Sequence, residues 1–325
     1  MKCDSMKITT QTAREMLEVL EELRKELFQK RKVSYSYAEW ERKRELVRRR
    51  LRKLPEFVKR AAEEVQRTKS GAGRPKRLDP VQRTMLFLFA RLMNKSNRDT
   101  EELLELFEPL FGFKVSYKAV ERLYSDEEVE LVLHNLLKLL LREEGVSGNF
   151  AGDGTGYSLT ITKHYRTNPK KRSKDYRYVF RWIDLGTGMY VGFGYSKKSE
   201  MDAFNKAMKM LERLGIAVDE ASLDKYYSSR KVLKLFGKRT AVYVIPKRNI
   251  SKLGFEWARV VKRVVEDPVL FLEKYFMRNL SEAGFSADKR RFGWTVRQRR
   301  EDRQESATFS IALLHNLFAV RVGSK

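Results

Sequence analysis

The spacing of apolar residues divides the chain into a helical first part and a strand-rich second part. From about residue 10 to residue 67, apolar residues such as Leu17, Leu20 and Leu23 recur every three or four positions, which predicts amphipathic helices. A second helical unit is predicted from about residue 81 to residue 144, where MLFLFARLM and LVLHNLLKLLL indicate buried helices. Both runs are interrupted by charged or polar residues and are shorter than the 18 apolar residues typical of a membrane span.

Near residue 149 the pattern changes to three β-rich runs separated by glycines: FAGDGTGYSLTI, YRYVFRWIDLG and MYVGFGYS. The helix EMDAFNKAMKMLERLG follows, and then the strand EASLDKYY, the short helix SRKVLKLFG and the strand TAVYVIPK. Three strands in a meander, followed by alternating helix and strand, predict a mixed sheet with helices on its faces. We therefore expect an α/β domain over residues 149–325, preceded by an all-α basic region.

The part before residue 149 is expected to contain a basic helical region over residues 1–69, a linker over 70–80 and a helical unit over 81–148. The linker SGAGRPKRLDP is rich in glycine, proline and cations, as linkers often are. Its Gly73-Arg74-Pro75-Lys76 core resembles an AT-hook, in which Arg74 would enter a narrow minor groove. An AT-hook usually has a further arginine where Ala72 stands.

Two capping pairs predict helix starts in the unit 81–148: Asp99 with Glu102, and Ser125 with Glu128. Between them, GFKVSYKAVERLYS predicts a turn followed by a short helix that begins at Ser116. A helix-turn-helix here would present Lys118, Glu121 and Arg122 to a DNA groove. A plain helical bundle is the alternative interpretation.

The charge of the chain narrows the choice of partner. The formal net charge is +25 and the pI is near 10.0, so nucleic acid is the first candidate partner and a membrane surface the second. The stretch RKRELVRRRLRK, residues 42–53, has eight cations in twelve positions. It is either a solubilising helix face or a helix that lies along a phosphate backbone, which arginine binds well.

Few residues are available for soft metal ligands or disulfides. Cys3 is the only cysteine and the chain has three histidines, which disfavours a zinc site or a disulfide framework. A metal would therefore be held by oxygen. The N-terminal segment MKCDSMKITT has no apolar core of a secretion signal, so we expect an intracellular protein.

Three acidic residues stand at positions where a charged side chain is expected to have a chemical role. Asp153 lies in the first predicted strand and Asp224 ends the fourth, and these strands can be neighbours in a mixed sheet; Glu282 lies on a later helix. A turn acid and a helix cap are the structural interpretations of the two aspartates. Together, three carboxylates favour Mg²⁺ or Mn²⁺, and two such ions about 4 Å apart promote displacement at phosphorus. Glu200 and Asp184 are alternative ligands.

Glu282 belongs to a polar stripe within YFMRNLSEAGFSADK. On a helix that advances about 100° per residue, Tyr275, Arg278, Glu282 and Lys289 fall within about 60° of arc. The structural interpretation is a solvated face with an Arg278–Glu282 ion pair. The functional interpretation is a metal-binding acid flanked by groups that hold a phosphate chain.

These residues resemble the motifs of a large group of insertion-sequence transposases. The stripe matches that group's signature: Tyr, two residues, Arg, three residues, Glu, six residues, Lys. Asp153-Gly154-Thr155 is similar to the group's first motif, and the stretch from Asp224 to Ser228, with Pro246 downstream, is similar to its second. The resemblance covers about residues 149–320. Many members have glycine at the position of Tyr226, and the first 148 residues match no named motif.

The resemblance implies a DDE transposase with a ribonuclease-H-like catalytic domain. Asp153, Asp224 and Glu282 would be the metal ligands, and Tyr275, Arg278 and Lys289 would hold the transposon-end strand. The implied reaction is hydrolysis that frees 3′ ends, followed by transesterification into target DNA without a covalent enzyme intermediate. The implied partners are double-stranded DNA, as terminal inverted repeats and target, and a second subunit, in the prokaryotic cytoplasm at the nucleoid. A structure-specific nuclease and a non-catalytic DNA-binding protein are the alternatives.

Overall fold

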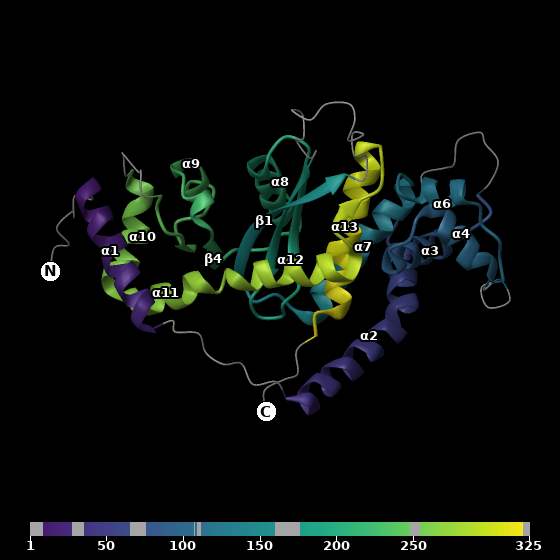
Figure 1. The fold of residues 1–325 in the computed structure, drawn as a ribbon, viewed down its shortest axis with the longest axis horizontal. Helices are drawn as coiled ribbons and strands as arrows, with labels where there is room; N and C mark the ends of the chain where they lie inside the picture. Colours follow the sequence, from purple (N-terminus) through teal and green to yellow (C-terminus); the bar gives the residue numbers. More distant parts are fainter. Residues whose placement is uncertain are drawn as a thin grey trace, which may run out of the picture.

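The computed structural model describes residues 9–27, 36–65, 76–106, 108, 112–159, 176–247 and 254–320. The helices over these residues are α1 (Thr10–Leu27), α2 (Tyr37–Glu63), α3 (Pro80–Met93), α4 (Asn97–Leu106), α6 (Tyr117–Leu123), α7 (Glu127–Glu144), α8 (Glu200–Arg213), α9 (Arg230–Leu233), α10 (Phe255–Glu266), α11 (Pro268–Phe276), α12 (Asn279–Phe292) and α13 (Glu301–Phe318). The strands are β1 (Asn149–Leu159), β2 (Tyr176–Asp184), β3 (Tyr190–Ser196), β4 (Glu220–Leu223), β5 (Ala241–Tyr243) and β6 (Thr295–Val296). The molecule is elongated, with the sheet near its middle (Figure 1).

The strands form one mixed sheet in the order β3-β2-β1-β4-β5. β1, β2 and β3 are an antiparallel meander, whereas β4 joins β1 and β5 joins β4 in parallel. The predicted mixed α/β sheet and the adjacency of the first and fourth strands are therefore confirmed. The strand predicted over EASLDKYY ends early, at Leu223, because the Asp224 carboxylate accepts the Tyr226 N–H and starts a 3₁₀ turn.

Helices pack against both the meander and the central strand. α8 lies against β2 and β3, α12 contacts β1 and β2, and α13 contacts β3. Gly194 in β3 permits the close approach of α8, since a Cβ at this position would run into the Ala203 carbonyl. α11 and α12 run along one line beneath the sheet and carry the Tyr275–Lys289 stretch past it (Figure 1).

The two helices of the predicted region 1–69 contact different parts of the molecule. α1 packs against α10 and α11, while α2 contacts α3, α7 and α13, and the two helices lie toward opposite ends (Figure 1). Arg50 of the basic stretch donates to the Asn316 and Ala319 carbonyls, each at 2.8 Å. This arginine thus caps the end of α13, while most of the other cations of residues 42–53 are exposed.

The helix starts in the unit 81–148 differ in part from the predicted ones. Ser116 caps α6 as predicted. The Asp99 and Ser125 assignments are wrong. The Ser96 hydroxyl accepts the Asp99 N–H and the Asp99 carboxylate accepts the Ser96 N–H, so Asp99 is the third residue after the cap. α7 is capped by Asp126. Ser96 lies three residues before the predicted Asp99, and Asp126 lies one residue after the predicted Ser125, in runs with several residue types that cap helices well.

A buried ion pair ties α12 to the sheet. Arg181 of β2 is 0% exposed and donates to the Asp288 carboxylate at 2.6 Å; Asp288 is 2% exposed. The other Asp288 oxygen lies 2.7 Å from His315 Nδ1 on α13. One carboxylate therefore joins β2, α12 and α13. Because Asp288 directly precedes Lys289, this network fixes the part of α12 that faces the candidate site.

We expect Asp288→Ala to lower the free energy of unfolding by about 3–5 kcal/mol, since it leaves the Arg181 guanidinium buried without its partner. Glu301→Gln, which breaks the exposed Lys197–Glu301 pair, should cost less than about 1 kcal/mol. Urea unfolding followed by circular dichroism measures both. Equal effects of the two substitutions would contradict a structural role for the buried pair.

Candidate active site

Asp153 stands on β1, just beyond the last residue of β1 that pairs with β4. Gly152 pairs with Leu223, so Asp153 and Asp224 are the next residues on two neighbouring parallel strands. Burial raises the pKa of Asp153 from 3.8 to about 7; the Gly154 N–H opposes this, and the charges of Glu200, Glu282 and Asp224 add to it. The Asp153 carboxyl therefore lies within the electrostatic reach of three other carboxylates.

Arg278 holds the other two predicted acids. Its Nη1 lies 2.5 Å from Glu282 Oε1 and 3.4 Å from Asp224 Oδ2. Burial disfavours the charge of Arg278, but Tyr275, Asp224 and Glu282 outweigh it and raise the pKa of this guanidinium. The predicted Arg278–Glu282 pair is thus present, and it extends to an acid from a distant part of the sequence.

The polar stripe is not carried by a single continuous helix. α11 ends at Phe276 and α12 starts at Asn279, so the prediction of one helix is wrong at the Met277–Arg278 junction. The Ser222 hydroxyl from β4 donates to the Lys274 carbonyl at 2.8 Å, and the Arg278 N–H bonds to Tyr275 three residues back. The tightened turn results from this tertiary contact.

Lys289 and Tyr275 occupy different environments at the two ends of the stripe. Lys289 Nζ donates to Thr155 Oγ1 at 2.6 Å, and burial, together with Arg181, lowers the pKa of Lys289. Tyr275 is 5% exposed, and the Arg278 guanidinium lies 5.2 Å from its ring centroid. Lys289 thus contacts β1 at Thr155, two residues after Asp153, whereas Tyr275 packs against Arg278.

Of the two alternative ligands, Glu200 lies at the site and Asp184 does not. Glu200 begins α8 and accepts a 2.5 Å hydrogen bond from the buried Tyr227 hydroxyl. Gly154 leaves room for Glu200, because a Cβ there would collide with the glutamate. The Asp184 carboxylate accepts four hydrogen bonds from Ser147 and Thr187 at the turn after β2, which is a structural role. Sequence inspection missed Tyr227, although it stands in the second motif.

The three predicted acids approach one another around positive charge from the protein itself. The carboxylates come from β1, the end of β4 and α12, and their mutual repulsion is relieved by positive charge, here that of Arg278. Among the described residues, no three His, Cys, Asp or Glu side chains lie close enough together to hold a metal ion. The Asp224 and Glu282 oxygens are instead engaged by the Arg278 guanidinium.

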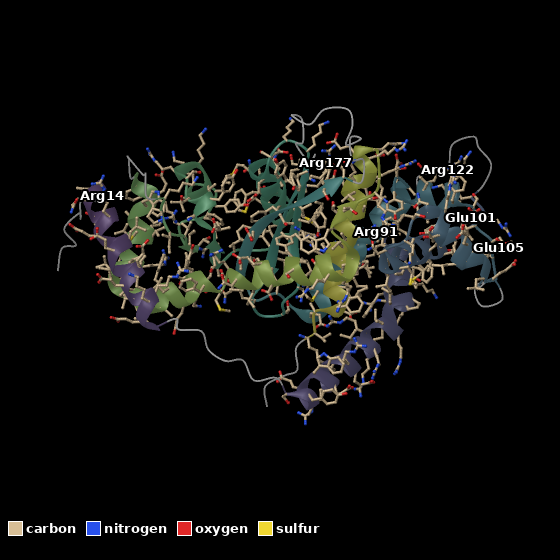
Figure 2. All side chains as sticks on the ribbon, in the orientation of Figure 1. Arg14, Arg91, Glu101, Glu105, Arg122 and Arg177 are labelled. Carbon is tan, nitrogen blue, oxygen red and sulfur yellow. The ribbon has the colours of Figure 1, made fainter. Side chains whose placement is uncertain are left out.

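A cavity lined in part by arginine side chains lies in the helical unit that follows residue 76. This cavity of about 1130 Å³ between α3, α6, α7 and the start of α13 is lined by Arg122, Arg300 and Arg303, and also by acidic residues of α7. Arg122 is exposed on α6, at the opposite end of the molecule from Arg14 (Figure 2). Lys118 is exposed on the same helix, whereas Glu121 pairs with Arg303. Arg74 lies outside the described residues.

The raised pKa of Asp153 predicts a pH dependence of stability. A carboxyl whose folded pKa exceeds its unfolded value contributes stability fully below about pH 4 and loses it as the pH rises through about 7. Three pKa units correspond to about 4 kcal/mol, and partial exposure reduces this to roughly 2 kcal/mol. In metal-free buffer at pH 8, we expect Asp153→Asn to be more stable than the wild type by this amount.

Urea unfolding between pH 4 and pH 8 tests this expectation. The advantage of Asp153→Asn should disappear near pH 4, and Asp202→Asn, a substitution at a partly exposed acid of α8, should show no such trend. An Asp153→Asn effect that stays constant with pH would show that burial does not raise the pKa of this carboxyl.

Comparison with known proteins identifies the family. No protein-family model matches the chain. A probable transposase for insertion sequence element ISA1214 from Archaeoglobus fulgidus is 66% identical over 316 residues, which covers 97% of this chain and 98% of that protein. No helix in the described segments is long and apolar enough to cross a membrane. The extent and the level of identity show that the chain belongs to the family of insertion-sequence transposases.

Proposed function

We propose that this protein is a DDE-type DNA transposase that cleaves DNA at transposon ends and joins the freed 3′ ends to target DNA. The observation that carries the proposal is the convergence of Asp224 and Glu282 on Arg278, next to Asp153, whose carboxyl is influenced by both. The sheet order, with a parallel β4 and β5 added to an antiparallel meander, supports a ribonuclease-H-like catalytic domain.

Asp153, Asp224 and Glu282 would hold Mg²⁺ or Mn²⁺. When bound, these ions supply activation of the attacking oxygen and stabilisation of the leaving oxygen in displacement at phosphorus. The attacking group is water in the cleavage step and a 3′ hydroxyl in the joining step. Each step exchanges one phosphodiester oxygen for another, so no enzyme side chain has to form a bond to phosphorus.

The cations at the site would bind and orient the DNA strand. Lys289 is held by Thr155 on the strand that carries Asp153, so its ammonium is available next to the acids for a phosphate. Arg278 pairs with both Asp224 and Glu282. Its guanidinium would bind the phosphate when a cation takes over the acids. The Tyr275 ring packs against the Arg278 guanidinium and would position it.

The partner would be double-stranded DNA, bound as terminal inverted repeats and as target, with two subunits in the DNA complex. The net charge of +25 and the exposed Lys118 and Arg122 on α6 support binding by the helical unit. An AT-hook contact by Arg74 remains part of this proposal.

A structure-specific nuclease is the second candidate, because Glu200 lies beside Asp153. Ribonuclease H has a metal-binding acid at the start of the corresponding helix. An RNA:DNA hybrid separates the two functions: a transposase leaves the hybrid uncut and cleaves DNA at inverted-repeat ends, whereas a ribonuclease H cleaves the RNA strand.

We expect Asp153→Asn, Asp224→Asn and Glu282→Gln each to reduce Mg²⁺-dependent cleavage of inverted-repeat DNA by at least about 1,000-fold, with DNA affinity changed less than about threefold. Glu273→Gln, at an exposed position of α11, is the matched control and should cleave normally. Cleavage by Glu282→Gln at the wild-type rate would remove Glu282 from the catalytic set.

We expect binding to random-sequence duplex DNA to weaken steeply with KCl, because binding neutralises phosphates. For about six phosphates, the slope of log K against log salt is about −5, and Arg122→Ala should reduce its magnitude by about 1. Fluorescence anisotropy measures the slope. A flat salt response would argue against every nucleic-acid function considered for this chain.

A further inference from the structure

The first helix of the chain packs next to the residues that lead to the candidate active site. α1 contacts α10 and α11, and its apolar face is buried there, with Met16 6% exposed and Leu20 2% exposed. α2, which follows α1 in the sequence, lies with the helical unit instead (Figure 1). α1 is therefore structurally a part of the region that carries the candidate site, and the proposed function gives it no task there.

The last turn of α1 places a guanidinium against the end of α11. Arg24 Cζ lies 5.6 Å from the Phe276 ring centroid. The Phe276 ring meets the Tyr275 ring edge-on, with the two centroids 5.4 Å apart. α11 ends at Phe276, so both rings stand directly before the helix junction at which Arg278 lies.

The Tyr275 ring continues this contact to the candidate site. Tyr275 is buried, and Arg278 Cζ lies 5.2 Å from its ring centroid. Burial raises the pKa of Tyr275, and the positive charges of Arg278 and Arg24 both oppose that rise. The pair of rings from Tyr275 and Phe276 is therefore enclosed between two arginines, one from α1 and one that binds the acids of the site.

The Arg278 guanidinium has few fixed contacts besides the acids. Its Nη1 reaches Asp224 and Glu282, whereas its buried Nε has no hydrogen-bond partner in the described part of the chain. Under the proposed function a phosphate replaces the acids as the partner of Arg278, and the Tyr275 ring is then the protein contact that keeps the guanidinium in place. A misplacement of about 1 Å at a reacting site can lower a rate about 100-fold, so the support of the Tyr275 ring matters for the reaction.

We propose that Arg24 is a positioning residue for Arg278, and that α1 holds the Tyr275 and Phe276 rings against which the Arg278 guanidinium packs. The inference rests on the proposed function for the role of Arg278. It adds that the first helix of the chain, which is distant from the acids in the sequence and does not touch them, sets the geometry of the site.

Hydrogen–deuterium exchange of the full-length protein, without DNA and in EDTA, tests the contact itself. Arg24→Ala should speed the exchange of the amides of residues 275–282 by about 3- to 10-fold, because the rings at the helix junction lose one of their two cationic neighbours. Arg24→Lys keeps a cation over Phe276 and should restore most of the protection. Lys25→Ala is the matched control, since Lys25 is the adjacent exposed cation in the same turn of α1, and it should exchange like the wild type.

A double-mutant cycle on Mg²⁺-dependent cleavage of inverted-repeat DNA tests the route by which α1 acts. Arg24→Ala should lower kcat by about 3- to 10-fold and leave KM within about twofold. Tyr275→Leu removes the ring that transmits the contact, so adding Arg24→Ala to it should have no further effect. Tyr275→Phe keeps the ring, and in that background Arg24→Ala should have its full effect.

Wild-type exchange at residues 275–282 in Arg24→Ala, or an equal loss of kcat from Arg24→Ala with and without the Tyr275 ring, would overturn the positioning role. The exchange assay contains neither DNA nor a divalent cation, so its outcome is independent of cleavage. Faster exchange in Arg24→Ala combined with full cleavage by Glu282→Gln would instead overturn the proposed catalytic set and leave the contact of α1 in place. Thermal unfolding of each variant confirms that the fold is retained.

Discussion

Repulsion among carboxylates that the fold brings together is the constraint on which the site depends. Parallel pairing of β1 with β4 makes Asp153 and Asp224 neighbours, and α12 adds Glu282. Arg278 supplies compensating charge to Asp224 and Glu282. Burial, with a smaller contribution from the neighbouring carboxylates, raises the pKa of Asp153 to about 7. Under the proposed function, a metal ion would take over the charge compensation that Arg278 supplies here.

The surrounding structure keeps these groups in place by buried polar contacts. Asp288 links β2, α12 and α13 through Arg181 and His315, and it immediately precedes Lys289. The Ser222 hydroxyl on β4 donates to the Lys274 carbonyl at the break between α11 and α12, just before Arg278. The helix break and the buried carboxylate therefore set the positions of Arg278 and Lys289 relative to the sheet.

Local patterns in the sequence predicted most of the elements and a mixed sheet in which the first and fourth strands can be neighbours, but not β6 or the position of β5. The adjacency of Asp153 and Asp224 followed from the expected mixed sheet, and the Arg278–Glu282 pair followed from helical spacing. The helix break at Arg278 could not be predicted, because it depends on a hydroxyl more than fifty residues away in β4. The contacts of α1 with α10 and α11, the Arg181–Asp288 pair and the Arg24–Phe276 contact depend on tertiary packing in the same way.

We propose that Asp153, Asp224 and Glu282 together hold the divalent cations of the reaction. Anomalous diffraction from crystals grown with Mn²⁺ tests it most directly. The account predicts a manganese peak within coordination distance of oxygens from all three carboxylates, with the Arg278 guanidinium withdrawn from Asp224 or Glu282. Manganese bound elsewhere, or no peak at the three carboxylates at saturating Mn²⁺ with the Arg278 pairs intact, would contradict it.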